Sequence, residues 1–141
     1  MKIRKVTKED LVEISDIFRV ESAKKPYFQK WNKKTALRDI TKSFKEDDFY
    51  IYVIDKKIVG FIISQINENN EGYVNELWII KEFQGKGIGK ALTKFIEDKY
   101  KKKEVKSIGL TANQKAGAVN FYKKLKYKVK HELFYMIKEL K

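Results

Sequence analysis

The sequence of 141 residues has no cysteine, one proline and one histidine. Without cysteine there is no disulfide, no thiolate nucleophile and no cysteine-ligated zinc. With His131 as the single imidazole, a histidine-based metal site is not expected, and we predict no metal cofactor. No apolar run approaches the roughly 20 residues of a membrane-spanning helix, and the first residues lack the apolar core of a secretory signal. We therefore expect a cytoplasmic protein with no membrane partner.

Linkers rich in proline, serine or glycine are also missing, so the chain shows no boundary between domains. We expect one domain over residues 1–141, since this length suits a single domain. A chain of this size can bury roughly two-thirds of its unfolded surface, so one hydrophobic core is feasible.

Positive charge is plentiful and unevenly distributed. The formal net charge is +13, of which residues 1–80 carry +2 and residues 81–141 carry +11. Such an excess attracts a polyanionic cofactor, an acidic partner or nucleic acid. The alternative is a set of solvated lysines on helix faces, which suits the lysines at 99–103, because cations stabilise the C-terminal end of a helix. Composition alone leaves both interpretations open.

The spacing of apolar residues predicts a series of strands and helices. We predict strands over residues 2–6, 49–54, 58–66, 74–80, 105–111, 127–130 and 132–138, and helices over residues 11–22, 34–44, 87–102 and 117–125. Asp55-Lys56-Lys57 would close a hairpin. A helix joins strands 74–80 and 105–111, so these should be parallel with a right-handed crossover. The predicted fold class is α/β, a mixed sheet with helices on both faces in the order β-α-α-β-β-β-α-β-α-β-β.

A glycine-rich segment follows the predicted strand 74–80 and opens a helix; it reads Gln84-Gly85-Lys86-Gly87-Ile88-Gly89-Lys90-Ala91-Leu92-Thr93. Three glycines within five residues leave the backbone uncovered by side chains. The first turn of a helix also has free N–H groups and a partial positive charge. A turn of this kind binds anions, and phosphate matches it best. Lys86 and Lys90 add full charges beside it.

The glycine spacing excludes two common phosphate-binding motifs. The P-loop needs a Ser or Thr after a Gly-Lys pair, and the dinucleotide-binding fingerprint needs a longer last interval between glycines. Gln84, Gly87 and Gly89 instead match Q/R-x-x-G-x-G/A, the pyrophosphate loop of the GNAT superfamily of N-acetyltransferases. The segment 118–127 resembles the same superfamily's A-x-x-x-Y-x-x-x-G-F/Y element. Together the resemblance covers roughly residues 72–130, and the predicted order of elements is also that of the GNAT fold.

The resemblance implies acetyl-CoA as co-substrate and assigns the residues that would bind it. Gln84 stands at the motif's Q/R position, and the cofactor's pyrophosphate would be held by backbone N–H groups of Gly85, Lys86, Gly87, Ile88, Gly89 and Lys90. The backbone of Leu77, Trp78 and Ile79 would pair with the pantetheine arm as if it were an added strand. One of these N–H groups would face the thioester oxygen as a one-donor oxyanion hole. Asn113 would contact the pantetheine arm, although Lys115 competes for that place because the segment looks one residue short.

The same resemblance implies two catalytic side chains. Tyr122 would donate a proton to the departing sulfur; the alternative is a tyrosine that only packs on its helix. Glu76 would remove a proton from the amine through water, because an alkyl amine is mostly protonated at neutral pH. The alternatives are a surface carboxylate paired with a lysine, or no base at all. Thr111 occupies the place where some relatives carry a glutamate, and it cannot serve as a base.

One position departs from the family's pattern. Lys126 stands where the family has a glycine after the last helix. If Lys126 takes a left-handed conformation, it costs about 1 kcal/mol relative to glycine.

Two functions remain open at this point. The first is an acetyltransferase that moves the acetyl group from acetyl-CoA to a primary amine of a small molecule or a protein, by direct transfer in a ternary complex. Glu21, Tyr27, Phe28 and Trp31 would form an aromatic and acidic acceptor cleft; the alternative is that Tyr27, Phe28 and Trp31 close the core beneath a loop. The second is a non-catalytic basic module for RNA or the ribosome, or an acyl-CoA sensor. Nucleic acid is disfavoured because no aromatic stacking motif accompanies the lysines; a homodimer is left open.

Overall fold

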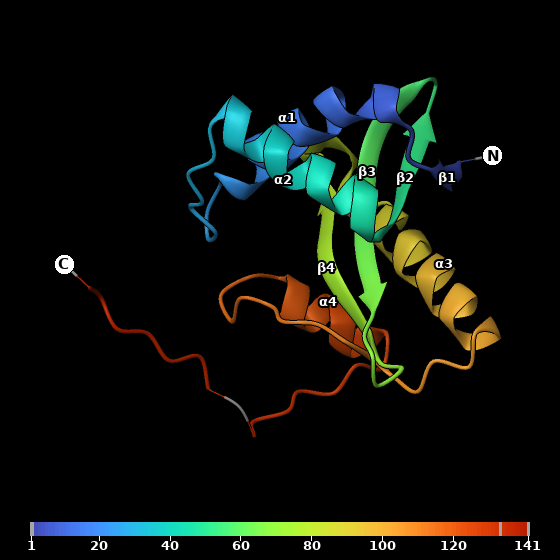
Figure 1. The fold of residues 1–141 in the computed structure, drawn as a ribbon, viewed down its shortest axis with the longest axis vertical. Helices are drawn as coiled ribbons and strands as arrows, with labels where there is room; N and C mark the ends of the chain where they lie inside the picture. The colour runs from blue at the N-terminus through green and yellow to red at the C-terminus, as the bar shows by residue number, and fades with distance from the viewer. Residues whose placement is uncertain (1, 133, 141) are drawn as a thin grey trace. The chain divides into compact units, whose positions relative to one another are not determined.

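The computed structural model describes residues 2–132 and 134–140. The chain divides into two units, 1–111 and 112–141, and each is described by itself. The first unit holds the sheet and the helices α1 to α3, and the second holds α4 (Figure 1). Among the described residues, no helix is long and apolar enough to cross a membrane.

The first unit is built on a five-stranded sheet with the strand order β1-β2-β3-β4-β5. The strands are β1 (Ile3–Lys5), β2 (Asp48–Ile54), β3 (Lys57–Ile66), β4 (Gly72–Ile79) and β5 (Ile108–Gly109). The helices are α1 (Leu11–Ser22), α2 (Lys33–Glu46) and α3 (Ile88–Lys102), with short 3-10 turns η1 (Lys8–Asp10) and η2 (Lys81–Phe83). The first four strands are antiparallel to their neighbours, whereas β4 and β5 are parallel. The predicted mixed sheet is therefore confirmed.

Local sequence explains where these elements begin and turn. Asn32 caps α2, because its side-chain oxygen accepts a hydrogen bond of 2.8 Å from the backbone N–H of Thr35. Asp55 and Lys56 both have positive φ, 47° and 66°, the backbone of the two-residue hairpin turn whose twist matches the strands it joins. The predicted hairpin between residues 49–54 and 58–66 is thus confirmed.

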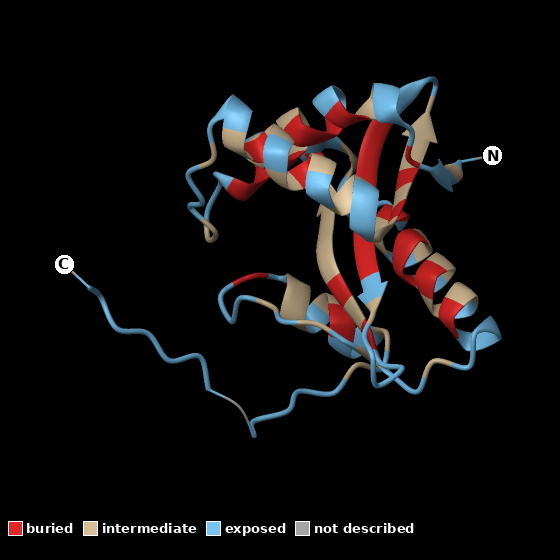
Figure 2. Ribbon diagram, in the orientation of Figure 1, coloured by how far each residue is buried: buried red, intermediate tan, exposed pale blue. Residues whose placement is uncertain are grey.

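The helices cover both faces of the sheet, as the sequence predicts. One core cluster joins α1 and α2 to one face through residues such as Ile14, Ile40 and Phe61. A second joins α3 to the other face through residues such as Ile62, Leu92 and Ile96. In Figure 2 the inward stripes of these helices are buried and their outer stripes are exposed. This division matches the helical spacing of apolar residues in each segment.

A buried polar contact holds the far end of α3 on the sheet. The Tyr100 hydroxyl donates to Asp48 at 2.6 Å and lies 2.7 Å from the Ser64 hydroxyl. Its ring packs so closely on Gly72 that a Cβ there would come within 2.9 Å of it. The orientation of α3, and with it the position of its N-terminus, is fixed by this contact as well as by the apolar cluster.

The last strand of this sheet is shorter than predicted. The sequence predicts a strand over 105–111, but β5 has two residues and pairs with β4 only at Gly72–Ile108 and Tyr73–Gly109. The prediction was wrong in length because strand propensity does not reveal where two neighbouring strands diverge.

The second unit contains α4 (Ala118–Lys124) and then a chain without regular structure over 126–132 and 134–140. The two final strands predicted over 127–130 and 132–138 are not formed by the described residues, and Leu133 lies outside them. Side chains such as Phe134, Tyr135 and Met136 are more than four-fifths exposed. The alternation of apolar and polar residues in these segments predicts strands. A strand exists only when its backbone pairs with a neighbour, and these described residues have no such pairing.

Candidate active site

The glycine-rich turn between β4 and α3 has an uncovered backbone. Gly85 and Gly87 have φ of 76° and 85°, and a Cβ built on either meets nothing within 4 Å. Gly87 is the N-cap of α3, and the first hydrogen bond within that helix runs from Ala91 N–H to its carbonyl. The N–H groups of the preceding residues, Ile88, Gly89 and Lys90, therefore point out of the helix end and have no partner within the helix. The turn has the free donors and open space that a phosphate group needs.

Exposed cations flank this turn. Lys86 and Lys90 are both exposed, and neither takes part in an ion pair among residues 2–132 and 134–140. The Lys86 ammonium lies 5.4 Å from the centre of the Phe83 ring. Positive charge at the helix N-terminus is unfavourable for the helix itself, so it is better explained by an anionic ligand than by helix stability.

Gln84 fastens the turn to the end of β4. Its side-chain amide donates a hydrogen bond of 2.9 Å to the carbonyl of Ile79. The structure therefore gives this residue a role in shaping the turn.

The edge of β4 that faces away from β3 is open. On its inner edge, β4 pairs with β3 up to Ile79, and Ile80 N–H donates to the Val59 carbonyl at 2.9 Å. Backbone groups alternate between the two edges of a strand, so the N–H groups of Ile79 and Leu77 point to the outer edge and that of Trp78 points to β3. In the part of the chain that the structure describes, no strand pairs with this outer edge beyond Tyr73. Of the three residues predicted to bind the pantetheine arm, Leu77 and Ile79 therefore present backbone N–H groups to the open edge, whereas Trp78 does not.

A bulge precedes this open stretch. The register of β3 and β4 shifts between Ile63–Glu76 and Ser64–Val74, which leaves Asn75 as an extra residue. The Asn75 side-chain oxygen is buried and has no hydrogen-bond partner among the residues that the structure describes. Nothing in the sequence marks Asn75, because a bulge depends on the pairing of two strands.

Glu76 and Trp78 point to the face of the sheet covered by α1 and α2. The Trp78 indole N–H donates a hydrogen bond of 2.7 Å to a Glu76 carboxylate oxygen. Burial raises the pKa of Glu76 from its ordinary value of 4.5 to about 7, the hydrogen bond from Trp78 opposes this shift, and the negative charge of Asp39 adds to it. A carboxylate with a pKa near neutrality can accept a proton at physiological pH.

Two aromatic side chains from the connection between α1 and α2 pack against neighbouring rings, one of them against Trp78. The Tyr27 ring meets the Trp78 ring edge-on, with 4.9 Å between centroids, and the Trp31 ring lies 5.0 Å from that of Phe18. Burial raises the pKa of the Tyr27 hydroxyl. Tyr27 and Trp31 therefore pack beneath this connection, as the core-closing alternative predicts, while Phe28 is 64% exposed. The fourth predicted residue, Glu21, is buried and paired with Lys24 at 2.9 Å.

The remaining predicted residues lie in the second unit. Tyr122 is buried on α4, with its ring 4.9 Å from that of Phe121 and 5.3 Å from that of Tyr127. Asn113 is exposed, and its side-chain oxygen accepts a hydrogen bond of 2.8 Å from the Lys115 N–H in a local turn. His131 is exposed. No group of three or more histidine, aspartate or glutamate side chains that could hold a metal occurs among the described residues.

The structure also reveals a cation that the sequence did not indicate. The Lys57 ammonium lies 6.0 Å from the centre of the Phe83 ring, the same ring that Lys86 approaches. Residue 57 is distant from Phe83 in sequence, and its ammonium approaches that ring only because the start of β3 runs beside the end of β4.

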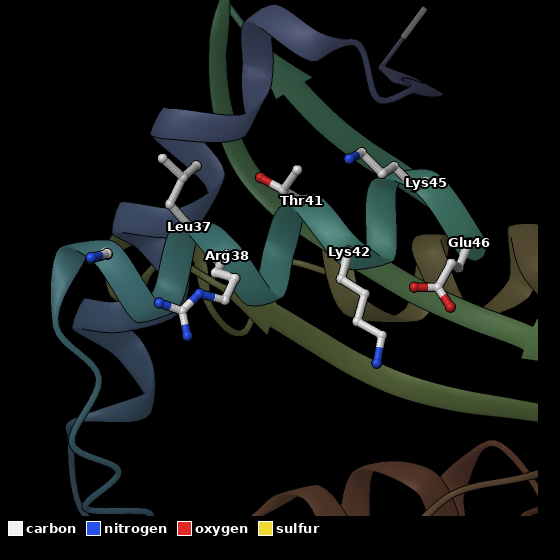
Figure 3. Close-up of a pocket in the computed structure, with 7 residues that line it drawn as sticks. Leu37, Arg38, Thr41, Lys42, Lys45 and Glu46 are labelled. Atoms are coloured by element: carbon white, nitrogen blue, oxygen red, sulfur yellow. The ribbon is translucent and has the colours of Figure 1, made fainter.

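A groove on α2 contains none of the residues predicted for the active site. Figure 3 shows that every side chain lining it comes from that one helix: Lys34, Leu37, Arg38, Thr41, Lys42, Lys45 and Glu46. A groove along one helix surface has no opposing wall, so it is less suited to chemistry than the open edge of β4.

Comparison with known proteins identifies the family. The family model for the acetyltransferase (GNAT) domain matches residues 8–136 of this chain. The chain belongs to the GNAT acetyltransferase family. The predicted resemblance is therefore confirmed, and the family match continues across both units of the structure.

Two curated relatives are named as N-acetyltransferases. An uncharacterized N-acetyltransferase of Methanocaldococcus jannaschii is 30% identical over 91% of this chain and 61% of its own length. A second from the same organism is 36% identical over 71% of this chain and 59% of its own length. The chain thus spans about three-fifths of the length of the curated relatives it matches.

Solved structures confirm the fold class. A possible acetyltransferase from Clostridium difficile 630 superposes with a TM-score of 0.84, at 16% identity, over 99% of this chain and 98% of its own. The PaiA N-acetyltransferase from Thermoplasma acidophilum, in complex with coenzyme A, gives a TM-score of 0.75 at 26% identity over 92% of this chain and 90% of its own.

Proposed function

We propose that this protein transfers the acetyl group of acetyl-CoA to a primary amine. The observation that carries the proposal is the open outer edge of β4, which is followed, after the short turn η2, by the uncovered glycine-rich turn at the N-terminus of α3. An extended arm with amide groups fits the first feature, and a diphosphate fits the second. Coenzyme A has both parts in that order, and the family assignment agrees with it.

Binding in this proposal is done mainly by backbone. The amides from Gly85 to Lys90 hold the diphosphate, with Lys86 and Lys90 as neighbouring charges. The outward N–H groups of Leu77 and Ile79 bind the pantetheine arm, and Asn113 contacts the same arm. Acetyl-CoA supplies an acetyl group activated as a thioester. One of the outward N–H groups stabilises the negative charge that develops on the carbonyl oxygen.

Glu76 acts as the base. Its carboxylate accepts a proton from the acceptor ammonium through water, so that the neutral nitrogen can form a bond to the carbonyl carbon. Support comes from its burial, its contact with Trp78 and its pKa of about 7. At that pKa about half of the groups are ionised at neutral pH, which suits general base catalysis.

Tyr122 acts as the acid. Its hydroxyl donates a proton to the sulfur as the bond between carbon and sulfur breaks, and the tyrosinate takes up the second proton that the nitrogen loses as the amide forms. This role comes from the family resemblance of segment 118–127, which lies within the family match over residues 8–136. With no cysteine in the chain, we propose direct transfer in a ternary complex without a thioester on the enzyme.

The acceptor is proposed to be an amine of a small molecule or a protein. Incubation of the purified chain with acetyl-CoA and a panel of amines, from monoamines and diamines to peptides with free N-termini or lysines, tests the proposal. We expect release of coenzyme A thiol that depends on the amine, with a matching acetylated product in mass spectrometry. Absence of amine-dependent release across the panel would argue against the proposed reaction.

A further inference from the structure

We propose that Lys57 and Lys86, on the Phe83 ring, form a second phosphate site that binds the 3′-phosphate of coenzyme A. The inference rests on the proposed function, because it assigns a further group of the same co-substrate. Coenzyme A carries a diphosphate and, separately, a phosphate on its ribose. The glycine-rich turn suits the first, and the second needs a further site.

The two lysines reach one place from distant parts of the chain. Lys57 is the first residue of β3, directed by the tight turn at Asp55 and Lys56. Two residues later, the Val59 carbonyl accepts the Ile80 N–H at 2.9 Å, which places the start of β3 beside the entry to η2. Lys86 lies within the glycine-rich turn itself. Their ammonium groups lie 6.0 and 5.4 Å from the centre of the Phe83 ring, respectively.

Both ammonium groups approach the same ring, and neither is paired with a carboxylate among the described residues. Neither lysine has an ion pair in the described part of the chain, although Asp55 and Glu82 lie nearby in sequence. Both lysines are exposed, and an exposed contact with an aromatic face holds an ammonium only weakly. A dianionic phosphate placed between the two ammonium groups would be attracted by both of them.

The source of the phosphate is indicated by position. Phe83 immediately precedes Gln84 and the glycine-rich turn, so a phosphate held there lies next to the proposed diphosphate site. Two phosphate groups of one molecule at neighbouring sites fit coenzyme A, whereas an unrelated anion would have no reason to bind beside it.

The test compares coenzyme A with 3′-dephospho-coenzyme A by isothermal titration calorimetry. We expect the wild-type protein to bind coenzyme A more tightly, by roughly three- to tenfold, as is usual for an exposed charge-assisted contact. In Lys57→Gln this preference should fall to near one, with affinity for the dephospho form unchanged. Lys56→Gln, the adjacent exposed lysine of the same turn, should retain the wild-type preference.

Several results would overturn the inference. A Lys57→Gln protein that keeps the full preference, or that loses affinity equally for both ligands, shows that this lysine does not bind the 3′-phosphate. Equal affinity of the wild-type protein for the two ligands has the same meaning and leaves the proposed reaction intact. If the wild-type protein binds neither ligand, the proposed function itself fails. Thermal melting of each variant without ligand checks that the fold is unchanged.

Discussion

Glu76 shows how one side chain changes character with its surroundings. On an exposed strand it would be an ordinary acid, but burial and the charge of Asp39 raise its pKa to about 7 while the Trp78 N–H partly opposes the shift. The sequence identifies the residue type and its strand, but not this environment.

For Glu76→Gln we expect kcat/KM for amine acetylation to fall and to lose its rise near pH 7. The base works only when ionised, so the wild-type activity should increase as the pH rises through about 7. A pH–rate profile of kcat/KM measures this. The control Glu68→Gln changes an exposed carboxylate in the turn before β4 and should leave the profile unchanged; an unaltered profile in Glu76→Gln would remove this residue from the role of base.

The raised pKa of Glu76 should make activity rise with pH, but it should make the stability of the folded protein fall with pH. Because the folded pKa of Glu76 lies above its ordinary value of 4.5, the stability that its protonated form provides is lost as the pH rises from that value through about 7. Thermal melting at pH 5 and pH 8 should therefore show a smaller loss of stability in Glu76→Gln than in the wild type.

For Tyr122→Phe we expect a lower kcat with little change in affinity for coenzyme A. The change removes only the hydroxyl that would protonate the sulfur, whereas the buried ring keeps its contacts with Phe121 and Tyr127. Steady-state kinetics and calorimetry measure the two quantities. Tyr135→Phe, at a tyrosine that is 87% exposed, serves as control, and a kcat equal to wild type in Tyr122→Phe would leave the proton source unassigned.

At the scale of elements, the glycine-rich turn depends on backbone conformation that few residues tolerate. For Gly87→Asp we expect loss of coenzyme A binding, since the new carboxylate would stand where the phosphates bind. The left-handed φ of 85° adds a stability cost of about 1–2 kcal/mol.

Calorimetry with coenzyme A measures the effect, and a matched control is available at α4. Gly117 also precedes a helix and also has open space around it, but its φ of −63° is ordinary for any residue. Gly117→Asp should therefore bind coenzyme A as the wild type does. Retained tight binding in Gly87→Asp would contradict the assignment of this turn to the diphosphate.

The end of α4 is closed by Lys126 in a left-handed conformation, with φ of 75°. Lys126 N–H donates to the Lys123 carbonyl and Tyr127 N–H to the Tyr122 carbonyl, both at 3.0 Å, which is the Schellman pattern of helix ends.

Lys126→Gly should raise the free energy of unfolding by up to about 1 kcal/mol. Urea denaturation measures this. Lys128→Gly should bring no such gain because Lys128 has no positive φ, and an equal gain there would contradict the explanation.

At the scale of the whole molecule, the net charge of +13 leaves two interpretations that ligand binding separates. Saturation with coenzyme A at 100 times its dissociation constant should stabilise the fold by about 2.7 kcal/mol. Thermal melting with coenzyme A and with tRNA compares the two ligands directly. A shift with tRNA and none with coenzyme A would favour the basic binding module over the enzyme.

Much of the fold could be predicted from the sequence because its signals are local. The spacing of Leu92 and Ile96 indicates a helix with one buried face, and the hairpin follows from two apolar runs joined by a short polar turn. The glycines at 85, 87 and 89, with Gln84 before them, identify the family because an uncovered backbone needs glycine itself.

Tertiary structure decided what depends on pairing between distant segments. The early divergence of β4 and β5, the bulge at Asn75 and the approach of Lys57 to Phe83 all arise from where strands meet. The pKa of Glu76 follows from burial, which sequence spacing does not measure. The absence of strands in the described parts of 127–138 has the same reason. Strand propensity is a property of one segment, whereas a strand forms only when that segment pairs with another.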